Sequence, residues 1–172
     1  MNQRASLQLN NFGFIDRVAF WVATGLGAGL MPKAPGTFGA LESVVVFVIA
    51  YAWSIPSQTL VILFVGLSLI SFVLGVWASS RVCRATGIDD PGQIVVDEIC
   101  GQFIALVPVA VAPSALGILL AFVLFRLFDI FKPYPIRKLE HLHGGLGVMA
   151  DDGLAGLYAA ALVWLAHYFR LV

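Results

Sequence analysis

The chain has 172 residues, of which 60% are hydrophobic and only 12% are charged, and its formal net charge is zero. Soluble domains average about one quarter charged residues, so this composition excludes water as the sole solvent. Nucleic acid is excluded as a partner because the chain has no basic stripe with interleaved aromatic residues. We therefore expect a membrane protein of single-domain length.

Taken in chain order, the apolar runs predict one partial helix and five longer ones. Residues 14–28 form an amphipathic or half-inserted helix, after a flexible N-terminal segment at residues 1–13. The longer apolar helices are expected at residues 37–55, 59–78, 99–112, 115–128 and 153–169. Residues 59–78 carry no charge over the roughly 20 residues that a bilayer core requires. The predicted fold is all-α, a polytopic membrane helical bundle of about five apolar helices plus the N-terminal helix, in a single domain.

Small apolar turns and charged loops alternate between these helices. Residues 56–58 and 113–114 are the small turns, and the longer loops carry nearly all the ionisable residues. Hairpins of this kind place nine of the ten Lys and Arg residues on one surface and leave only Arg170 for the other. Because short loops rich in Lys and Arg stay in the cytoplasm, that surface is predicted to face the cytoplasm.

The first polar loop, residues 29–39, contains two prolines and three glycines and cannot be a helix interior. A rigid loop is predicted, holding Lys33 close to a helix that starts near Thr37. Two interpretations stay open. The loop is an ordinary connector with Thr37 as the helix N-cap, or its backbone N–H groups and Lys33 bind an anion.

The second polar loop, residues 87–98, ends in the adjacent acids Asp97 and Glu98. Asp90 lies nearby in a Pro-Gly turn, and Gln102 follows Glu98 by one helical turn. One carboxylate would be enough to cap the following helix. At the membrane boundary an ionised acid is unfavourable unless it is paired with a cation or binds a metal. The pair therefore favours a functional site over simple capping.

The third polar segment, residues 125–136, spaces Arg126, Asp129 and Lys132 three residues apart. This spacing directs all three side chains to one side of a helix end. Capping does not explain Asp129, because an aspartate at a helix C-terminus faces the negative end of the helix dipole. A purely structural Arg126–Asp129 ion pair is the alternative to a functional site.

The fourth polar segment, residues 141–152, ends in Asp151 and Asp152 at the predicted start of the last apolar helix. They are either helix caps or a second acid pair at the same membrane depth as Asp97 and Glu98. The hairpin arrangement would bring all four polar segments to one plane, so several carboxylates and cations can converge on one pocket.

Carboxylate oxygens without a Cys or His ligand set suit a hard cation, most often Mg²⁺. Lys33, Arg126 and Lys132 would then clamp phosphate oxygens, and a carboxylate would act as base for a metal-activated water. An aspartate that attacks the phosphate in place of that water is the alternative nucleophile. The substrate is expected to carry a phosphate at headgroup level and acyl chains in the bilayer.

Four motifs, in order, carry a resemblance to a known family. They read Pro35-Gly-Thr-Phe-Gly39, Asp90-Pro-Gly-Gln-Ile-Val-Val-Asp-Glu98, Phe125-Arg-Leu-Phe-Asp-Ile-Phe-Lys-Pro-Tyr-Pro-Ile136 and His143-Gly-Gly-Leu-Gly-Val-Met-Ala-Asp-Asp152. From Phe14 onward the chain closely resembles the phosphatidylglycerophosphatase A family of bacterial membrane lipid phosphatases. The resemblance implies Mg²⁺-dependent removal of the terminal phosphate from phosphatidylglycerophosphate, a phospholipid of the inner membrane.

The resemblance also implies a set of site residues. The expected metal ligands are the motif acids Asp90, Asp97, Glu98, Asp129, Asp151 and Asp152. Of these, we expect Asp97, Glu98, Asp129 and Asp152 to be catalytic. The substrate phosphate is expected to bind Lys33, Thr37, Arg126 and Lys132. Val96 and Tyr134 stand where many relatives are expected to carry tryptophan, and Glu42 is left outside the core set.

A small ion-coupled membrane transporter is the alternative function, since intramembrane carboxylates can mark an ion path. A carrier needs polar access from both sides, and the predicted outward half has almost no ionisable residue. Phosphatases with a cysteine nucleophile are excluded, because neither Cys83 nor Cys100 begins a Cys-x5-Arg loop. Both cysteines are expected to be free thiols.

Overall fold

The computed structural model describes residues 12–139 and 142–172, and every regular element within them is helical. The elements are α1 (Phe14–Ala23), the 3₁₀ helix η3 (Gly25–Leu30), α2 (Pro35–Ala52), α3 (Ser57–Thr86), α4 (Val96–Leu106), α5 (Ala115–Phe131), α6 (Ile136–Leu139) and α7 (Gly145–Tyr168). The predicted all-α class is confirmed. Most of the segment predicted to be flexible, residues 1–11, lies outside the described residues.

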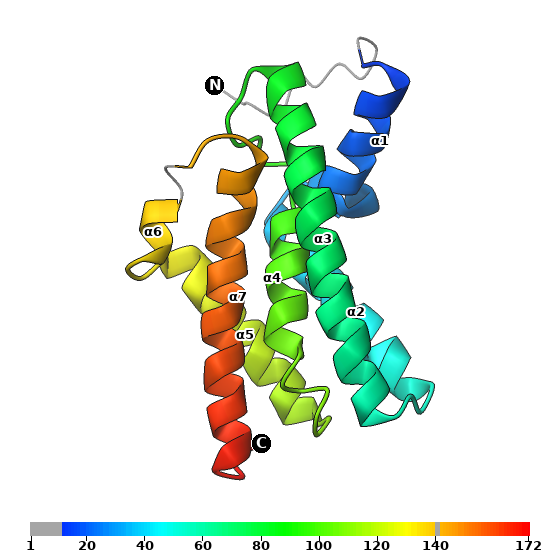
Figure 1. The fold of residues 1–172 in the computed structure, drawn as a ribbon, viewed down its shortest axis with the longest axis vertical. Coiled ribbons are helices and arrows are strands. Elements are labelled where there is room, and N and C mark those ends of the chain that lie inside the picture. Colours follow the sequence, from blue (N-terminus) through cyan, green and yellow to red (C-terminus); the bar gives the residue numbers. More distant parts are fainter. Residues whose placement is uncertain (1–11, 140–141) are drawn as a thin grey trace.

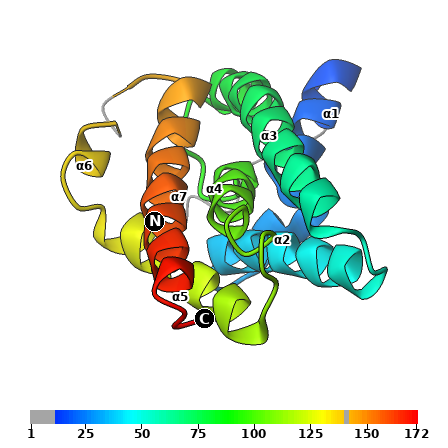
Figure 2. The same cartoon turned by 60° about the horizontal axis from the view of Figure 1, so that its bottom comes forward.

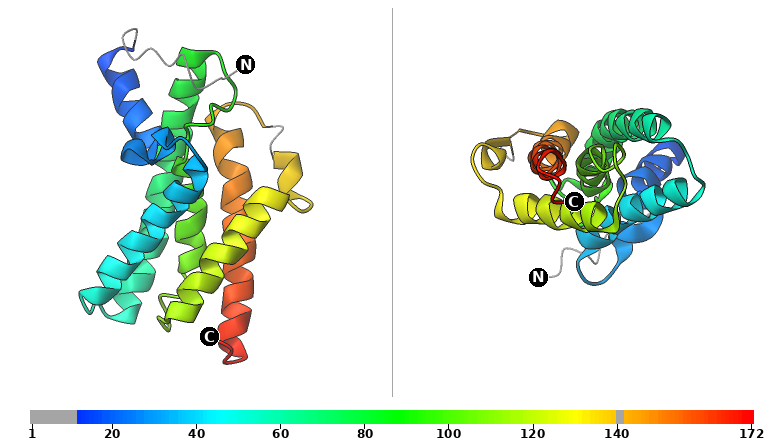
Figure 3. Two further views of the ribbon diagram at one scale, coloured as in Figure 1. Left: turned by 180° about the vertical axis from the view of Figure 1, so that it is seen from behind. Right: turned by 90° about the horizontal axis from the view of Figure 1, so that it is seen from below.

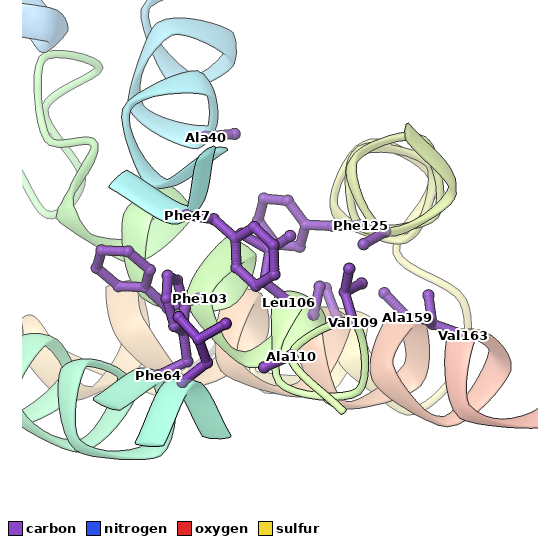
Figure 4. Packing of buried hydrophobic residues seen from close by; sticks show 14 of the residues in the cluster. Ala40, Phe47, Phe64, Phe103, Leu106, Val109, Ala110, Phe125, Ala159 and Val163 are labelled. Carbon is purple, nitrogen blue, oxygen red and sulfur yellow. The ribbon is translucent and has the colours of Figure 1, made fainter. Parts of the chain in front are cut away.

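Helix α4 lies at the centre of the bundle. It packs against α2, α3, α5 and α7, which surround it when the bundle is viewed from its lower end (Figure 2, Figure 3). The ring of Phe64 meets those of Phe47 and Phe103 edge to face, with centroids 4.9 and 5.6 Å apart (Figure 4). These buried aromatic contacts hold α4 between α2 and α3.

Three helices are long and apolar enough to cross a membrane, namely α2, α3 and α7. On α3, the side chains of Ile62, Leu69 and Val73 are each more than 60% exposed, which suits contact with lipid rather than water. Helix α4 has only 11 residues and rises about 16 Å, too little for a bilayer core. Helices form in all five predicted apolar regions, but the prediction of about five apolar membrane helices is not confirmed.

Three predicted helix ends are corrected by backbone chemistry. Helix α2 begins at Pro35, whose fixed φ suits the first helical position, and Ala34 rather than Thr37 precedes it as the N-cap. Helix α4 ends at Leu106, because the ring of Pro108 and its missing N–H disfavour a further turn. The N-terminal helix ends at Ala23 and does not reach residue 28, since positive φ angles at Gly25, Leu26 and Gly27 break it.

The two longest helices extend further than hydrophobicity predicts. Helix α3 continues through polar residues to Thr86 and stops where Gly87 adopts a left-handed conformation. Helix α7 begins at Gly145, whose added Cβ would lie 2.1 Å from the carbonyl oxygen of Val76 on α3. Asp151 and Asp152 therefore lie inside α7, and their interpretation as helix caps is wrong.

The polar segments lie at one end of the bundle (Figure 1). The loop between α3 and α4 and the start of α7 lie at the upper end in that view, with α6 beside them. The turns after α2 and α4 lie at the opposite end, together with the C-terminus. The predicted one-sided arrangement of charged loops is therefore what the fold produces.

Candidate active site

Two glycines let α4 and α7 approach closely. A Cβ on Gly156 would lie 2.4 Å from the carbonyl oxygen of Gly101, and a Cβ on Gly101 would lie 2.6 Å from the carbonyl oxygen of Asp152. Only residues without a Cβ permit this packing. The close approach brings the first turn of α4 alongside the second turn of α7.

Asp97 and Glu98 of α4 and Asp152 of α7 form an acidic cluster. One carboxylate oxygen from each of the three lies within 4.8 Å of the others. Asp152 is buried, and the other two side chains are half-buried. Asp129 of α5 lies close enough to interact electrostatically with Glu98 and Asp152. Acids from three helices thus converge.

The acidic cluster has the electrostatics of a cation site. Burial raises the pKa of the Asp97 carboxyl well above its usual range, and the nearby charges of Glu98 and Asp152 raise it further. Among the described residues, Oε2 of Glu98 and Oδ1 of Asp151 are buried without a hydrogen-bond partner. Buried carboxylate oxygens with no donor fit a hard divalent cation such as Mg²⁺.

Arg126 supplies positive charge on the α5 side of the acidic cluster. Its Nη1 lies 2.6 Å from Oδ2 of Asp129 and 3.8 Å from Oε1 of Glu98. The ion pair with Asp129 therefore forms. It is not isolated from the site, because the same guanidinium also contacts a member of the acidic cluster.

Lys132 reaches the site by a different route from the one its spacing predicts. It is the C-cap of α5, in a left-handed conformation with φ of 44°, because Pro133 disfavours further helix. It therefore lies just past the last helical residue of α5, while it still lines one cavity with Asp129. Its Nζ crosses to α7 and lies 2.5 Å from Oδ2 of Asp151.

A cavity of about 510 Å³ opens beside the acidic cluster, and we call it the acidic cavity. Its lining includes Lys132 and all six predicted metal ligands, Asp90, Asp97, Glu98, Asp129, Asp151 and Asp152. Asp89 and His143 also line it, and sequence reasoning did not select them. Two features of the sequence could have indicated them. Asp89 directly precedes Asp90, and His143 directly precedes the glycines at the start of α7.

Two predicted phosphate-binding residues lie outside the acidic cavity. Lys33 is exposed and Thr37 is half-buried in the first turn of α2, and neither is part of the lining. Their contacts with phosphate stay predictions. The first polar loop reaches the site through Gly36, whose added Cβ would lie 1.7 Å from Oε1 of Glu98 and 3.3 Å from Nη1 of Arg126.

Comparison with known proteins decides the family. The family model described as phosphatidylglycerophosphatase A matches residues 21–167. The chain belongs to the phosphatidylglycerophosphatase A family. The resemblance carried by the four sequence motifs is thereby confirmed, and the family is one of phosphomonoester hydrolases of lipid metabolism.

Curated relatives match over most of their length. Two carry the name phosphatidylglycerophosphatase A. The one from Haemophilus influenzae is 40% identical over 151 residues, 87% of this chain and 89% of the relative. The one from Escherichia coli is 31% identical over 152 residues, 87% of this chain and 84% of the relative. A Bacteroides thetaiotaomicron protein, provisionally named phosphatidylinositol-3-phosphatase, is 38% identical over 148 residues, 86% of this chain and 92% of the relative.

No solved structure matches the chain. The family assignment gives no support to the transporter alternative. The acidic cavity adds none, because its described lining comes from the polar end of the bundle alone. The site of this phosphatidylglycerophosphatase A family member brings carboxylates of three helices together with Arg126 and Lys132.

Proposed function

We propose that the protein is a Mg²⁺-dependent lipid phosphatase that hydrolyses the terminal phosphomonoester of phosphatidylglycerophosphate to phosphatidylglycerol and inorganic phosphate. One observation carries the proposal. Carboxylates of α4, α5 and α7 converge with Lys132 on one cavity at the polar end of a bundle with membrane-length helices. Two relatives named phosphatidylglycerophosphatase A support the substrate.

The acids divide into a metal-holding group and its surroundings. Asp97, Glu98 and Asp152 would hold the ion, and Asp90, Asp129 and Asp151 complete the oxygen-rich wall of the acidic cavity. Bound there, Mg²⁺ would supply charge neutralisation for the phosphoryl oxygens and lower the pKa of a nearby water. Without such an ion, the negative charges of the carboxylates would repel the phosphate of the lipid.

The remaining steps belong to the side chains. Lys132 binds non-bridging phosphate oxygens, while Arg126 holds Glu98 and Asp129 in place and adds positive charge behind them. Water attacks phosphorus, and a carboxylate of the site accepts its proton. The bond between phosphorus and the terminal glycerol oxygen breaks, and that oxygen takes up a proton to become the hydroxyl of phosphatidylglycerol.

The site is proposed to face the cytoplasm at the bacterial inner membrane. Figure 1 shows the end of α3, the start of α7 and α6 toward the polar end and the C-terminus at the opposite end. Arg81 and Arg84 belong to the last turns of α3, Arg137 and Lys138 belong to α6, and Arg170 follows α7 near the C-terminus. Cytoplasmic loops carry such an excess of Lys and Arg. The exposed Trp53, in the turn after α2, would then face the periplasm. A Trp53→Cys variant should therefore react with a membrane-impermeant maleimide in intact spheroplasts. The natural Cys83 and Cys100 are buried and should give little background labelling.

Purified protein in detergent micelles tests the function directly. Phosphate should be released from phosphatidylglycerophosphate, stop when the metal is chelated, and resume with added Mg²⁺. A phosphoinositide monophosphate should be assayed in parallel because of the name carried by one relative. Ion flux in reconstituted vesicles without phosphate release would favour the transporter and overturn the proposal.

A further inference from the structure

A second cavity, of about 440 Å³, lies where α5 passes into α6, and we call it the basic pocket. Among the residues that the structure describes, its lining includes Phe131, Lys132, Pro133, Tyr134, Arg137 and Lys138. Three of these residues are cations and none is an acid. Figure 1 shows α6 beside the upper part of α7, at the polar end of the bundle.

Lys132 joins the two cavities, since it lines both of them. Its Nζ contacts Asp151 at 2.5 Å on the side of the acidic cavity. Its left-handed backbone ends α5, and α6 follows at Ile136. The acidic cavity and the basic pocket are therefore neighbours that share one residue.

The other two cations of the basic pocket, Arg137 and Lys138, lie on the surface of the protein. Arg137 and Lys138 are exposed, and Nζ of Lys138 lies 5.0 Å from the centre of the Tyr134 ring. Among the residues that the structure describes, no carboxylate forms a salt bridge with either cation. A guanidinium fork beside an ammonium group matches an anion with several oxygens, such as a phosphate.

Apolar side chains border the basic pocket. Phe131 and Tyr134, which line it, are each 75% exposed. Large exposed apolar and aromatic residues next to cations are typical of the level where lipid headgroups meet acyl chains. A ligand with a phosphate and attached acyl chains fits this boundary.

We propose that the basic pocket binds the phosphodiester of the lipid substrate while the terminal phosphomonoester occupies the acidic cavity. This inference rests on the proposed function. Phosphatidylglycerophosphate carries two phosphates separated by one glycerol unit, and Lys132 lines both of the cavities that would receive them. The basic pocket would then select lipids that have a second phosphate over simple phosphomonoesters.

The double variant Arg137→Gln, Lys138→Gln tests the inference in neutral detergent micelles, where the substrate is the anionic lipid. The KM for phosphatidylglycerophosphate should rise about tenfold or more, with kcat within about twofold, because uniform binding energy is lost. Inhibition by phosphatidylglycerol, which has the diester alone, should weaken by a similar factor. Inhibition by inorganic phosphate, which has only the monoester site to bind, should stay unchanged.

The matched control is Arg84→Gln, an exposed cation at the same end of the bundle that lines neither cavity. It should leave all three measurements unchanged. A KM effect that appears only after anionic lipid is added to the micelles would assign the basic pocket to the surrounding membrane and overturn the inference.

The outcomes separate the two proposals. Active wild-type protein with an unaltered KM in the double variant would overturn the basic-pocket inference and leave the proposed function standing. Wild-type protein that releases no phosphate from phosphatidylglycerophosphate would overturn both. Retained helical circular dichroism and elution volume would establish that the variant is folded.

Discussion

The two adjacent acid pairs of the site look alike in sequence but sit differently on their helices. Asp97 and Glu98 lie in the first turn of α4, where free N–H groups and the helix dipole favour negative charge. Asp151 and Asp152 lie inside α7, beyond its first turn, and of the two Asp151 is supported by hydrogen bonds from the backbone and from Lys132. Within the α7 pair, Asp151 contacts Lys132, whereas Asp152 is buried beside other acids.

In both pairs the two acids differ in their contacts with cations. In each pair one acid faces a cation, since Glu98 lies near Arg126 and Asp151 contacts Lys132. Within residues 12–139 and 142–172, the other members, Asp97 and Asp152, form no salt bridge. The unpaired member of each pair is therefore the stronger candidate for a metal ligand, and the paired member is held in position.

The largest expected effect is on the unpaired acids. Asp97→Asn and Asp152→Asn should each lower kcat/KM by about 10⁴-fold, because a neutral amide binds Mg²⁺ far less well than a carboxylate. Thermal stability without metal should hold or rise, since the change removes a buried charge. Phosphate release and a thermal melt measure the two effects. An active Asp152→Asn variant would break the proposed division between paired and unpaired acids.

Asp129→Asn should abolish turnover, to below about 10⁻³ of wild type, while leaving expression and fold intact. Capping does not explain this acid, and it lines the acidic cavity and holds Arg126 at 2.6 Å. The measurement is phosphate release at saturating Mg²⁺ together with circular dichroism. Near-normal activity would remove Asp129 from the catalytic set and reduce its contact with Arg126 to a structural ion pair.

Asp151→Asn should have a smaller effect than Asp152→Asn in the same helix. A loss of about 10- to 100-fold in kcat/KM is expected, as is typical when a residue that positions the site is removed. Lys132 would lose its carboxylate partner but keep its place on the wall of both cavities. Equal losses for Asp151→Asn and Asp152→Asn, measured side by side, would contradict the comparison within this pair.

Gly36→Ala should give the smallest loss, about tenfold in kcat/KM. The added Cβ would lie 1.7 Å from Oε1 of Glu98 and displace that carboxylate from the acidic cluster. Gly66→Ala is the matched control, because no atom lies within 4 Å of its added Cβ. The control should keep full activity and stabilise α3 by up to about 1 kcal/mol. Equal activity in the two variants would exclude a role for Gly36 in seating Glu98.

The sequence predicts helix centres well and helix ends less well, for a reason visible at α3 and α7. Hydrophobicity indicates which residues contact lipid, so it predicts that the second long apolar helix ends at Ala78. The polar residues after Ala78 continue α3 as far as Thr86, and Gly87 ends it. The start of α7 is polar and glycine-rich, and its helix forms because Gly145 packs on the backbone of α3. Contacts of that kind are tertiary and leave no periodic signal.

The site shows the same division. Carboxylates at a membrane boundary were detectable because burying charge is costly, and every predicted metal ligand lies on the acidic cavity. Lys33 and Thr37 belong to a loop whose contact with the site is made by Gly36 instead. Asp89 and His143 line the cavity through the course of the loops before α4 and α7, which local spacing does not fix.

By itself, the sequence determined that the chain is helical, enters a membrane and collects its ionisable groups at one end, because solvation makes those properties local. The tertiary structure alone decided which acids meet. The Gly101–Gly156 approach brings Asp152 to Asp97 and Glu98, and the left-handed turn at Lys132 carries its ammonium to Asp151. Interactions between groups far apart in the chain depend on backbone packing in three dimensions.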